Sequence, residues 1–474
     1  MGPVPVCVLL SCAALCVLSV VRSVSATGAS EDEDEEYTWP QWRVPLVREK
    51  RTVRLAKPAF SARAQLSELR GACGIECQEG LPEPSATELE RLLSYETVYE
   101  NGTRTLTTVA LQGLMEAEQA WAAASLHPPK RTRQKREVYG VDTRFTIADK
   151  QFSTKYPFVT SVKVSTGCSG VLVSPKHVLT AAHCIHDGRD YVSGAQKLRV
   201  GVLKTKSKRG RGGGKGRGRG GKGRKGRKGG KGQDAEQQQE EGEEEEEESE
   251  NDNAIDTGDG AGGEAAAPAA QQGEGRGGRG GRRGRGRKGG RSRSRRSASD
   301  SGPPSFRWTT VKQTHVPKGW IKGESSRSQN VSSDYDYAIL ELKRAQKMRF
   351  MDLGVVPSIK KLPAGRIHFS GFDDDRPDQL VYRFCSVSEE SNDLLYQYCD
   401  AKPGSSGSGI YIRLKEAGKR QRWKRKIIGV FSGHQWVDVK GAQQDYNVAV
   451  RITPLKFAQI CHWVHGDSSI CQAT

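Results

Sequence analysis

Residues 179–184 read Leu179-Thr180-Ala181-Ala182-His183-Cys184, and this stretch decides the fold. An apolar run that begins at Val171 leads into it, which predicts a strand that ends just before the histidine. A second cysteine, Cys168, lies sixteen residues upstream of Cys184. A histidine fixed in place is suited to act as a general base, because proton transfer requires placement within hydrogen-bond reach. Taken alone, His183 is equally explained as a packed core residue.

Two further segments supply the partners that such a base needs. Asp336 stands at the head of an alternating apolar strand that runs to Leu342. Ser406 stands in a turn of small residues, 403–409, that reads PGSSGSG. The order His, Asp, Ser is one of several in which the same catalytic geometry recurs on unrelated folds. Each residue alone has a structural explanation, but the three together predict nucleophilic catalysis by a serine.

In these motifs the chain resembles the trypsin-like serine proteases. The resemblance covers roughly residues 137–203 and 306–474. The frames around His183 and Ser406 look closest to a secreted branch of this family, one of whose members is called inactive, and the basic insertion between His and Asp is more similar to that member. The resemblance implies peptide-bond hydrolysis as the activity and a protein or peptide as the substrate.

The resemblance also implies a role for each residue. Ser406 is the expected nucleophile, His183 the general base, and Asp336 the carboxylate that orients the imidazole. Asp334 is a competing carboxylate, but Asp336 holds the family position directly before the strand. The backbone N–H groups of Gly404 and Ser406 are expected to form the oxyanion hole.

Substrate preference rests on fewer residues. Asp400 lies six residues before Ser406, where trypsin places the carboxylate that selects basic side chains. This predicts a basic P1 residue, although Asp400 is equally explained as a surface turn residue. Ser432, Gly433 and His434 follow an apolar strand and are expected to line the opposite wall of the pocket.

The coarse pattern outside these motifs is all-β. Short alternating strands are separated by Gly, Pro and Asp turns, as in two packed six-stranded antiparallel barrels. Apolar spacing predicts a C-terminal helix from Pro454 to about Val464. The predicted strands are 158–164, 170–179, 197–203, 337–342, 366–370, 410–414, 426–432 and 447–452.

Features near the N-terminus predict secretion. Residues 4–21 are apolar and uncharged, and Val24-Ser25-Ala26 resembles a signal-peptidase site, so residues 1–26 are expected to be a signal peptide. No other run approaches the ~20 apolar residues of a membrane span. Two sequons, at Asn101 and Asn330, fit N-glycosylation in the same compartment.

The cysteines fit an oxidising compartment. An even number remains after the signal peptide, which favours disulfides. The family resemblance implies the pair Cys168–Cys184, whereas Cys385–Cys399 and Cys461–Cys471 are suggested by proximity in sequence alone. Cys73 and Cys77 either pair with each other or tether the N-terminal region to the rest. Their spacing has no matching pair or histidine motif nearby, so we expect no metal and no cofactor.

Residues 27–136 are expected to form a propeptide-like region. The region ends at Arg133-Gln134-Lys135-Arg136, a dibasic pattern that furin-type convertases cut. Cleavage after Arg136 would start the protease domain, 137–474, at Glu137. The alternative is a solvated basic linker with no processing.

The new terminus departs from trypsin. Trypsin's terminal ammonium pairs with an aspartate just before the catalytic serine, and here that position is Ser405. A serine cannot form this ion pair, so the trypsin activation switch is absent in that form. The frames at residues 140–144 and 404–408 are instead similar to bacterial glutamyl endopeptidases, which share the fold without that aspartate.

Residues 204–305 interrupt the protease domain with Gly-rich blocks of charge. Residues 204–231 and 276–296 are basic, and an acidic block separates them. Such sequence buries too little apolar surface to order itself, so we expect a disordered insertion. Its basic blocks favour heparan sulfate as a partner, since a secreted chain meets it sooner than nucleic acid. The alternative is a solvated loop whose charges neutralise one another.

Two functions are therefore open. One is a secreted serine endopeptidase made as a convertase-processed precursor. The other is an inactive protease homologue that binds extracellular polyanions or matrix. The branch member called inactive is similar here but carries threonine where this chain has Ser406, and the extra methyl of threonine crowds the attacking oxygen. The serine therefore favours the enzyme.

Overall fold

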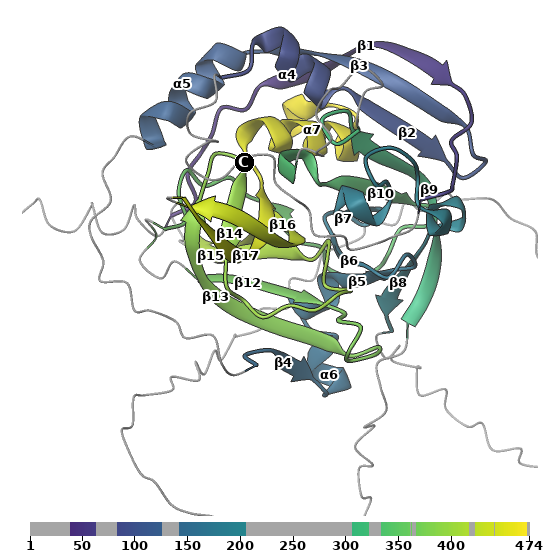
Figure 1. Ribbon diagram of the computed structural model, residues 1–474, viewed down its shortest axis with the longest axis vertical. Helices are drawn as coiled ribbons and strands as arrows, with labels where there is room; N and C mark the ends of the chain where they lie inside the picture. Colours follow the sequence, from purple (N-terminus) through teal and green to yellow (C-terminus); the bar gives the residue numbers. More distant parts are fainter. Residues whose placement is uncertain are drawn as a thin grey trace, which may run out of the picture. The chain divides into compact units, whose positions relative to one another are not determined.

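Two closed antiparallel barrels of six strands each organise the computed structural model of the chain, which confirms the predicted fold class (Figure 1). The first barrel closes where β8 pairs with β9, and the second closes where β16 pairs with β17. The first contains β5 (Ser161–Val164), β6 (Ser169–Leu172), β7 (His177–Thr180), β8 (Arg199–Leu203), β9 (Phe306–Pro317) and β10 (Ala338–Leu342). The second contains β12 (Arg366–Gly371), β13 (Leu380–Glu390), β14 (Leu394–Gln397), β15 (Gly409–Lys415), β16 (Trp423–Val439) and β17 (Ala442–Arg451).

The structure describes residues 38–62, 83–125, 142–204, 306–321, 333–360, 362, 366–416, 422–439 and 441–471. Several predictions fall outside these ranges and stay predictions. They concern the signal peptide 1–26, the cleavage between Arg136 and Glu137, the pairing of Cys73 and Cys77, the sequon at Asn330, and the insertion beyond residue 204.

A hairpin delivers the histidine segment, and here the sequence prediction was wrong. Residues 170–179 were expected to form one strand, but they form β6 and β7, which pair antiparallel. The turn between them is set locally. Ser174 Oγ accepts hydrogen bonds from the N–H groups of Lys176 and His177, both 3.1 Å long, and Pro175 brings no donor that a strand ladder could use. Strand β7 consequently ends at Thr180, three residues before His183.

The described part of the N-terminal region is built into the first sheet. It forms β1 (Leu46–Leu55), α4 (Ala86–Leu93), β2 (Tyr95–Tyr99), β3 (Arg104–Gln112) and α5 (Leu114–Ser125). Strand β2 pairs antiparallel with β9 over five residues, from Tyr95 opposite Pro317 to Tyr99 opposite Gln313. The sheet of the first barrel is thereby extended to nine strands. A region expected as a separate propeptide therefore shares backbone hydrogen bonds with the protease barrel.

Two tryptophans attach the same region to the second barrel. The backbone N–H of Trp39 donates to the carbonyl of Lys415 at 2.8 Å, and its indole Nε1 donates to the carbonyl of Lys424 at 3.0 Å. The indole of Trp42 donates to the carbonyl of Val355 at 2.9 Å. Each ring buries apolar surface while its N–H group finds an acceptor, which is how buried tryptophans are accommodated.

The predicted C-terminal helix is present as α7 (Pro454–His465). Thr453 caps its first turn, Pro454 occupies the first helical position, and Gly466 ends it in the left-handed conformation at φ 74°. The remaining short elements are β4 (Phe145–Ile147), α6 (Lys150–Ser153), β11 (Asp352–Leu353) and the 3-10 turns η1 (Phe158–Thr160), η2 (Ala182–Cys184), η3 (Ser193–Lys197), η4 (Ser333–Tyr335) and η5 (Ser468–Cys471).

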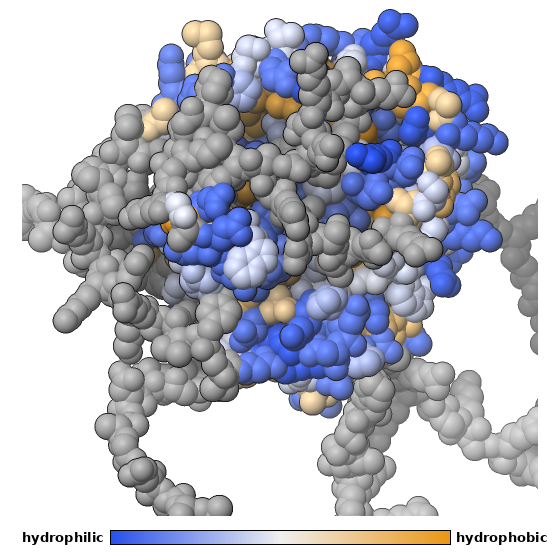
Figure 2. Space-filling view, in the orientation of Figure 1, coloured by the Kyte–Doolittle hydropathy of each residue, from blue (hydrophilic) through white to orange (hydrophobic). Residues whose placement is uncertain are grey.

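Surface and cross-links complete the description. Among the described residues, hydrophilic side chains dominate the face in Figure 2, and hydrophobic ones are scattered, several of them along the upper edge that Figure 1 shows to be formed by α4, β1 and β3. No helix in these parts of the chain is long and apolar enough to cross a bilayer. The disulfides Cys168–Cys184, Cys385–Cys399 and Cys461–Cys471 are all formed, which confirms the predicted pairings.

The junction between β2 and β9 contains a buried histidine. His315 Nδ1 shares a hydrogen bond with Thr97 Oγ1 at 2.9 Å, and its Nε2 shares a longer one with Gln313 Nε2 at 3.4 Å. The imidazole packs on the rings of Tyr95 and Trp463, whose centroids are 5.4 and 5.6 Å from its own. Burial lowers the pKa of His315 from 6.5 to about 3. As the pH falls below 6.5, this histidine becomes protonated in the unfolded chain. In the folded protein its imidazole stays neutral until the pH approaches 3.

This junction should make stability fall in weak acid. Because the folded pKa lies below the unfolded one, the contribution of His315 is complete above pH 6.5 and is lost as the pH falls towards 3. Between pH 7.5 and pH 5 this amounts to about 2 kcal/mol of the free energy of unfolding. Urea unfolding of a His315→Gln variant should show a flatter pH profile by this amount, with exposed His465→Gln as control. Identical profiles for the wild type and the His315→Gln variant would contradict this account.

Candidate active site

His183 sits in the short 3-10 turn η2 that follows β7. The disulfide between Cys184 and Cys168 ties this turn to the start of β6, so the backbone on both sides of the imidazole is held. The His183 side chain is 12% exposed, which leaves one edge accessible. The first barrel thus presents a histidine that is fixed but not enclosed.

The carboxylate of Asp336 lies against this histidine and is fully buried. His183 Nδ1 donates to Asp336 Oδ2 at 2.7 Å, and the backbone N–H of His183 donates to Oδ1 at 2.8 Å. Since a carboxylate only accepts, the proton of the neutral imidazole is on Nδ1. Nε2 lies 3.8 Å from Cys184 Sγ, which has no proton to donate because it is part of a disulfide, so Nε2 keeps its lone pair as an acceptor. The structure therefore brings Asp336, and not its competitor Asp334, to the histidine.

Ser432, on β16 of the second barrel, provides the third hydrogen bond to this carboxylate. Its hydroxyl donates to Asp336 Oδ2, and its backbone carbonyl accepts a 3.2 Å hydrogen bond from Ser406 Oγ. Sequence reasoning had assigned Ser432 to the wall of the substrate pocket. Its hydroxyl is instead fully buried and joins the carboxylate of one barrel to the serine of the other.

Ser406 lies in the turn between β14 and β15, whose shape depends on two glycines. Gly404 and Gly407 have φ values of 96° and 85°. A Cβ on Gly404 would lie 2.4 Å from the carbonyl oxygen of Phe372, and one on Gly407 would lie 2.3 Å from that of Ser169. Only glycine fits both positions, because conformation and space each exclude a side chain.

The predicted oxyanion hole uses two backbone N–H groups, those of Gly404 and Ser406. Neither the N–H of Gly404 nor that of Ser406 has an acceptor among the described residues. Ser169, which the sequence did not indicate, binds this loop through two hydrogen bonds. Its Oγ donates to the carbonyl of Gly404 and its N–H donates to the carbonyl of Ser406, both at 2.8 Å. The use of these N–H groups as an oxyanion hole stays a prediction.

The nucleophile and the base are not yet hydrogen-bonded. Within the described residues, Ser406 Oγ has one partner, the carbonyl of Ser432, and no hydrogen bond joins it to His183. The two side chains are linked indirectly: His183 bonds Asp336, Asp336 bonds the Ser432 hydroxyl, and the Ser432 carbonyl bonds Ser406 Oγ. Catalytic hydrogen bonds of this kind often form only with substrate bound.

Comparisons with known proteins identify the family. A family model named Trypsin matches residues 148–217. Inactive serine protease 35 of Bos taurus is 58% identical over 440 residues, which is 93% of this chain and 94% of that protein. Serine protease 23 of Homo sapiens is 44% identical over 438 residues, 92% of each chain.

This chain belongs to the trypsin-like serine protease family. The solved structure titled "Structure of Glu endopeptidase in complex with MPD" covers 68% of this chain and 97% of its own, with 15% identity and a TM-score of 0.36. Inactive serine protease 35 of Mus musculus matches at 52% identity over 448 residues.

Ser405 occupies the place of the trypsin aspartate and has a local role. Its hydroxyl donates to the carbonyl of Lys402 at 2.7 Å, and the hydroxyl of Ser408 donates to the Ser405 carbonyl at 2.7 Å. The turn is therefore closed on itself by short hydrogen bonds. Ser405 itself offers no carboxylate for an ion pair to a terminal ammonium of the trypsin kind.

A buried ion-pair cluster lies beside this turn. Arg144 contacts Asp142, Asp373 and Asp375 at 2.7–2.8 Å, and these hydrogen bonds raise its pKa above the usual value. Arg383, fully buried, donates from Nη2 to both oxygens of Asp373. Asp374, which follows Asp373 in the sequence, donates its N–H to the carbonyl of Pro403 at 2.8 Å. The start of the protease domain is thus connected through aspartates to the loop that carries Gly404.

Sequence reasoning missed this cluster. The run Asp373-Asp374-Asp375-Arg376 was a visible signal of concentrated charge, but its main partner, Arg144, lies 229 residues away from Asp373. A charge run is more often a solvated face, so nothing in the sequence distinguished a buried cluster from an exposed one.

The residues predicted to set substrate specificity make different contacts in the structure. Asp400 Oδ2 accepts hydrogen bonds from the N–H and the hydroxyl of Thr143, both at 2.8 Å, so its carboxylate anchors the segment at the start of the domain. His434 pairs through Nε2 with Asp445, and both are partly exposed. Gly433 continues β16 with φ 148°. Preference for a basic P1 residue remains a prediction.

The sulfur atoms nearest His183 do not form a metal site. Cys168, His183 and Cys184 place their ligand atoms within 4.8 Å of one another. Both sulfurs belong to one disulfide and lack the thiolate charge that metal binding requires. The donor set at this position does not fit a metal ion.

The buried cluster should be a major source of stability for the turn. Replacing Asp373 with Asn leaves Arg383 buried without a carboxylate, and breaking a buried pair typically costs about 3–5 kcal/mol. The matched control is Asp375→Asn: its carboxylate is 42% exposed, and such pairs are worth about 1 kcal/mol or less. Urea unfolding measures both. Equal losses in the two variants would show that Asp373 is no more important than a surface charge.

Proposed function

We propose that this protein is a secreted serine endopeptidase that hydrolyses peptide bonds through Ser406, His183 and Asp336. The observation that carries the proposal is the hydrogen bond from His183 Nδ1 to the buried carboxylate of Asp336, at 2.7 Å. It fixes the tautomer in which Nε2 accepts a proton, which is the state that a general base must have.

The proposed reaction follows from these positions. Ser406 Oγ leaves the carbonyl of Ser432, gives its proton to His183 Nε2 and bonds to the substrate carbonyl carbon. The N–H groups of Gly404 and Ser406 stabilise the oxygen that becomes negative. His183 then protonates the departing amine, the acyl group stays on Ser406, and water deprotonated by His183 releases the acid. Asp336 stays ionised and stabilises the imidazolium in both halves.

Processing is part of the proposal. A convertase cut after Arg136 would separate the N-terminal region from the domain that begins at Glu137. The pairing of β2 with β9 supports a two-chain product, because those backbone hydrogen bonds do not depend on the cut segment. Protein recovered from the medium of secreting cells should begin in part at Glu137, and an Arg136→Ala variant should lack that species.

A second candidate function is binding without catalysis. It is favoured by the name of the similar relatives, inactive serine protease 35, and by the absence of a hydrogen bond between Ser406 and His183 in the described structure. In this case the basic blocks 204–231 and 276–296 would attach the protein to heparan sulfate. Heparin affinity that survives deletion of residues 204–300 would contradict that attachment.

Covalent labelling separates the two functions. A fluorophosphonate probe should label the processed protein on Ser406, because His183 activates only that hydroxyl, and Ser406→Ala should remove the label. Ser405→Ala is the matched control: this neighbouring serine is equally buried but bonds Lys402, so labelling should persist. An Asp336→Asn variant should label far more slowly, by about 10⁴-fold if the tautomer is lost.

The result that contradicts the enzyme is equally specific. No label on folded, processed wild-type protein, or the same label on the wild type and the Ser406→Ala variant, would leave the binding function as the better account.

A further inference from the structure

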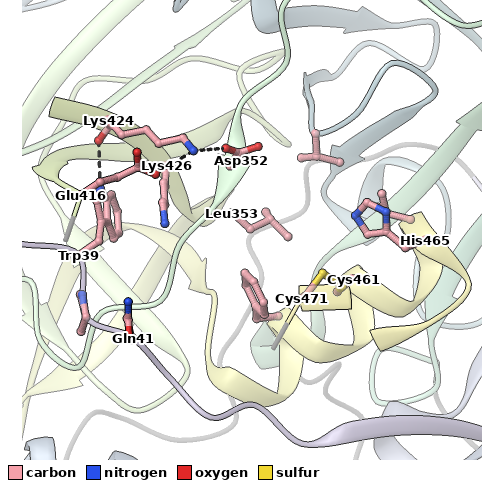
Figure 3. Close-up of a pocket in the computed structure, with 14 residues that line it drawn as sticks. Trp39, Gln41, Asp352, Leu353, Glu416, Lys424, Lys426, Cys461, His465 and Cys471 are labelled. Carbon is pink, nitrogen blue, oxygen red and sulfur yellow. Dashed lines mark hydrogen bonds and ion pairs between the residues drawn. A yellow bond between two sulfur atoms is a disulfide. The ribbon is translucent and has the colours of Figure 1, made fainter. Parts of the chain in front are cut away.

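A pocket lies apart from the residues of the candidate active site. It has a volume of about 400 Å³ and lies where the N-terminal segment at Trp39, the strand β16 and the helix α7 meet. Figure 3 shows Lys426 reaching into this space between Trp39 and Leu353, with the Cys461–Cys471 disulfide on the far side. None of its lining residues belongs to the triad, the oxyanion turn or the Arg144 cluster.

The ammonium group of Lys426 has no counter-ion. The residue is 8% exposed, and within the described part of the chain Nζ makes no ion pair and no hydrogen bond. Its one close partner is the ring of Trp39, whose centroid is 5.2 Å away. Burial lowers the pKa of Lys426. An enclosed ammonium without a carboxylate is costly, so long side chains normally place it in water or pair it.

The neighbouring lysine shows the contrast. Lys424 Nζ pairs with Asp352 Oδ2 at 2.8 Å and with Glu416 Oε1 at 3.0 Å. These are the two carboxylates that line the same pocket, and both are occupied by Lys424. The charge of Lys426 is therefore left facing the cavity, as Figure 3 shows.

Rigid packing keeps Lys426 in this position. Trp39 is held at its backbone and at its indole by two carbonyls, and its ring lies so close to Gly354 that a Cβ there would approach it to 2.5 Å. The same added Cβ would lie 2.8 Å from the Cβ of Lys426. The Trp39 ring and the base of the Lys426 side chain are therefore packed in place, which forms this wall of the site before any ligand arrives.

We propose that this pocket binds a small carboxylate that carries an apolar body. The carboxylate would pair with Lys426 Nζ, and the body would lie against Leu353, Phe457 and Val464. A singly charged ligand fits best, because one unpaired ammonium is available and the carboxylates of Asp352 and Glu416 would repel a dianion such as a phosphate monoester. Apolar walls with one placed charge are typical of small-molecule sites.

Binding of hexanoate to the full chain tests this proposal, with hexanol as the uncharged probe of equal length and hexyl phosphate as the dianion. NMR titration, followed at the indole N–H of Trp39, reports both affinity and place. Hexanoate should bind at least about tenfold more tightly than either of the other two, which corresponds to about 1.4 kcal/mol. Equal affinity for hexanol, or no shift of the Trp39 signal with hexanoate, would overturn the proposal without any variant.

Two variants assign the charge. Lys426→Met keeps the aliphatic stem on Trp39 but removes the ammonium, so the preference for hexanoate over hexanol should disappear. Lys424→Arg is the control, because a cation stays paired with Asp352 and Glu416, and the preference should persist. Hexanoate affinity that is unchanged in Lys426→Met, or lost equally in Lys424→Arg, would overturn the assignment. The outcome is independent of Ser406 and therefore of the proposed peptidase activity.

Discussion

The carboxylate of Asp336 is the interaction on which the rest of the site depends. It is fully buried and accepts three hydrogen bonds, two from His183 and one from Ser432. A charge in this position is tolerated only because each donor compensates for lost water. Since His183 belongs to the first barrel and Ser432 to the second, the same carboxylate connects the barrels and sets the imidazole. Ser406 enters this network through the Ser432 carbonyl.

The turn around Ser406 is held by contacts within the chain and not by an ion pair at position 405. Ser405 closes the turn through Lys402, and Asp374 holds Pro403 from the loop that Arg144 and Arg383 anchor. All of these residues lie after the expected cleavage point at Arg136, within the protease domain. The N-terminal region contributes in another way, by adding β2 to β9 and by placing Trp39 on β16.

The sequence predicted the parts of the molecule that local motifs encode. His183, Asp336 and Ser406 stand in short frames whose order is informative, and the alternating strands and α7 follow from periodicity. The role of Ser432 was not predictable, because its hydroxyl meets a carboxylate 96 residues away. The same holds for strands β1, β2 and β3, since strand propensity does not name the edge that a strand will join. In the sequence Lys426 is one basic residue among several, and only the packing shows that its ammonium has no carboxylate partner among the described residues.

The tautomer of His183 is the most direct test of the central claim, and nitrogen NMR of the folded protein at neutral pH measures it. The account predicts a protonated Nδ1, a slowly exchanging Nδ1–H, and an unprotonated Nε2. Replacement of Asp336 with Ala should remove the slow exchange, while Asp334→Ala should not. A proton on Nε2 in the wild type, or an Nδ1–H that exchanges as fast as in a surface histidine, would contradict it.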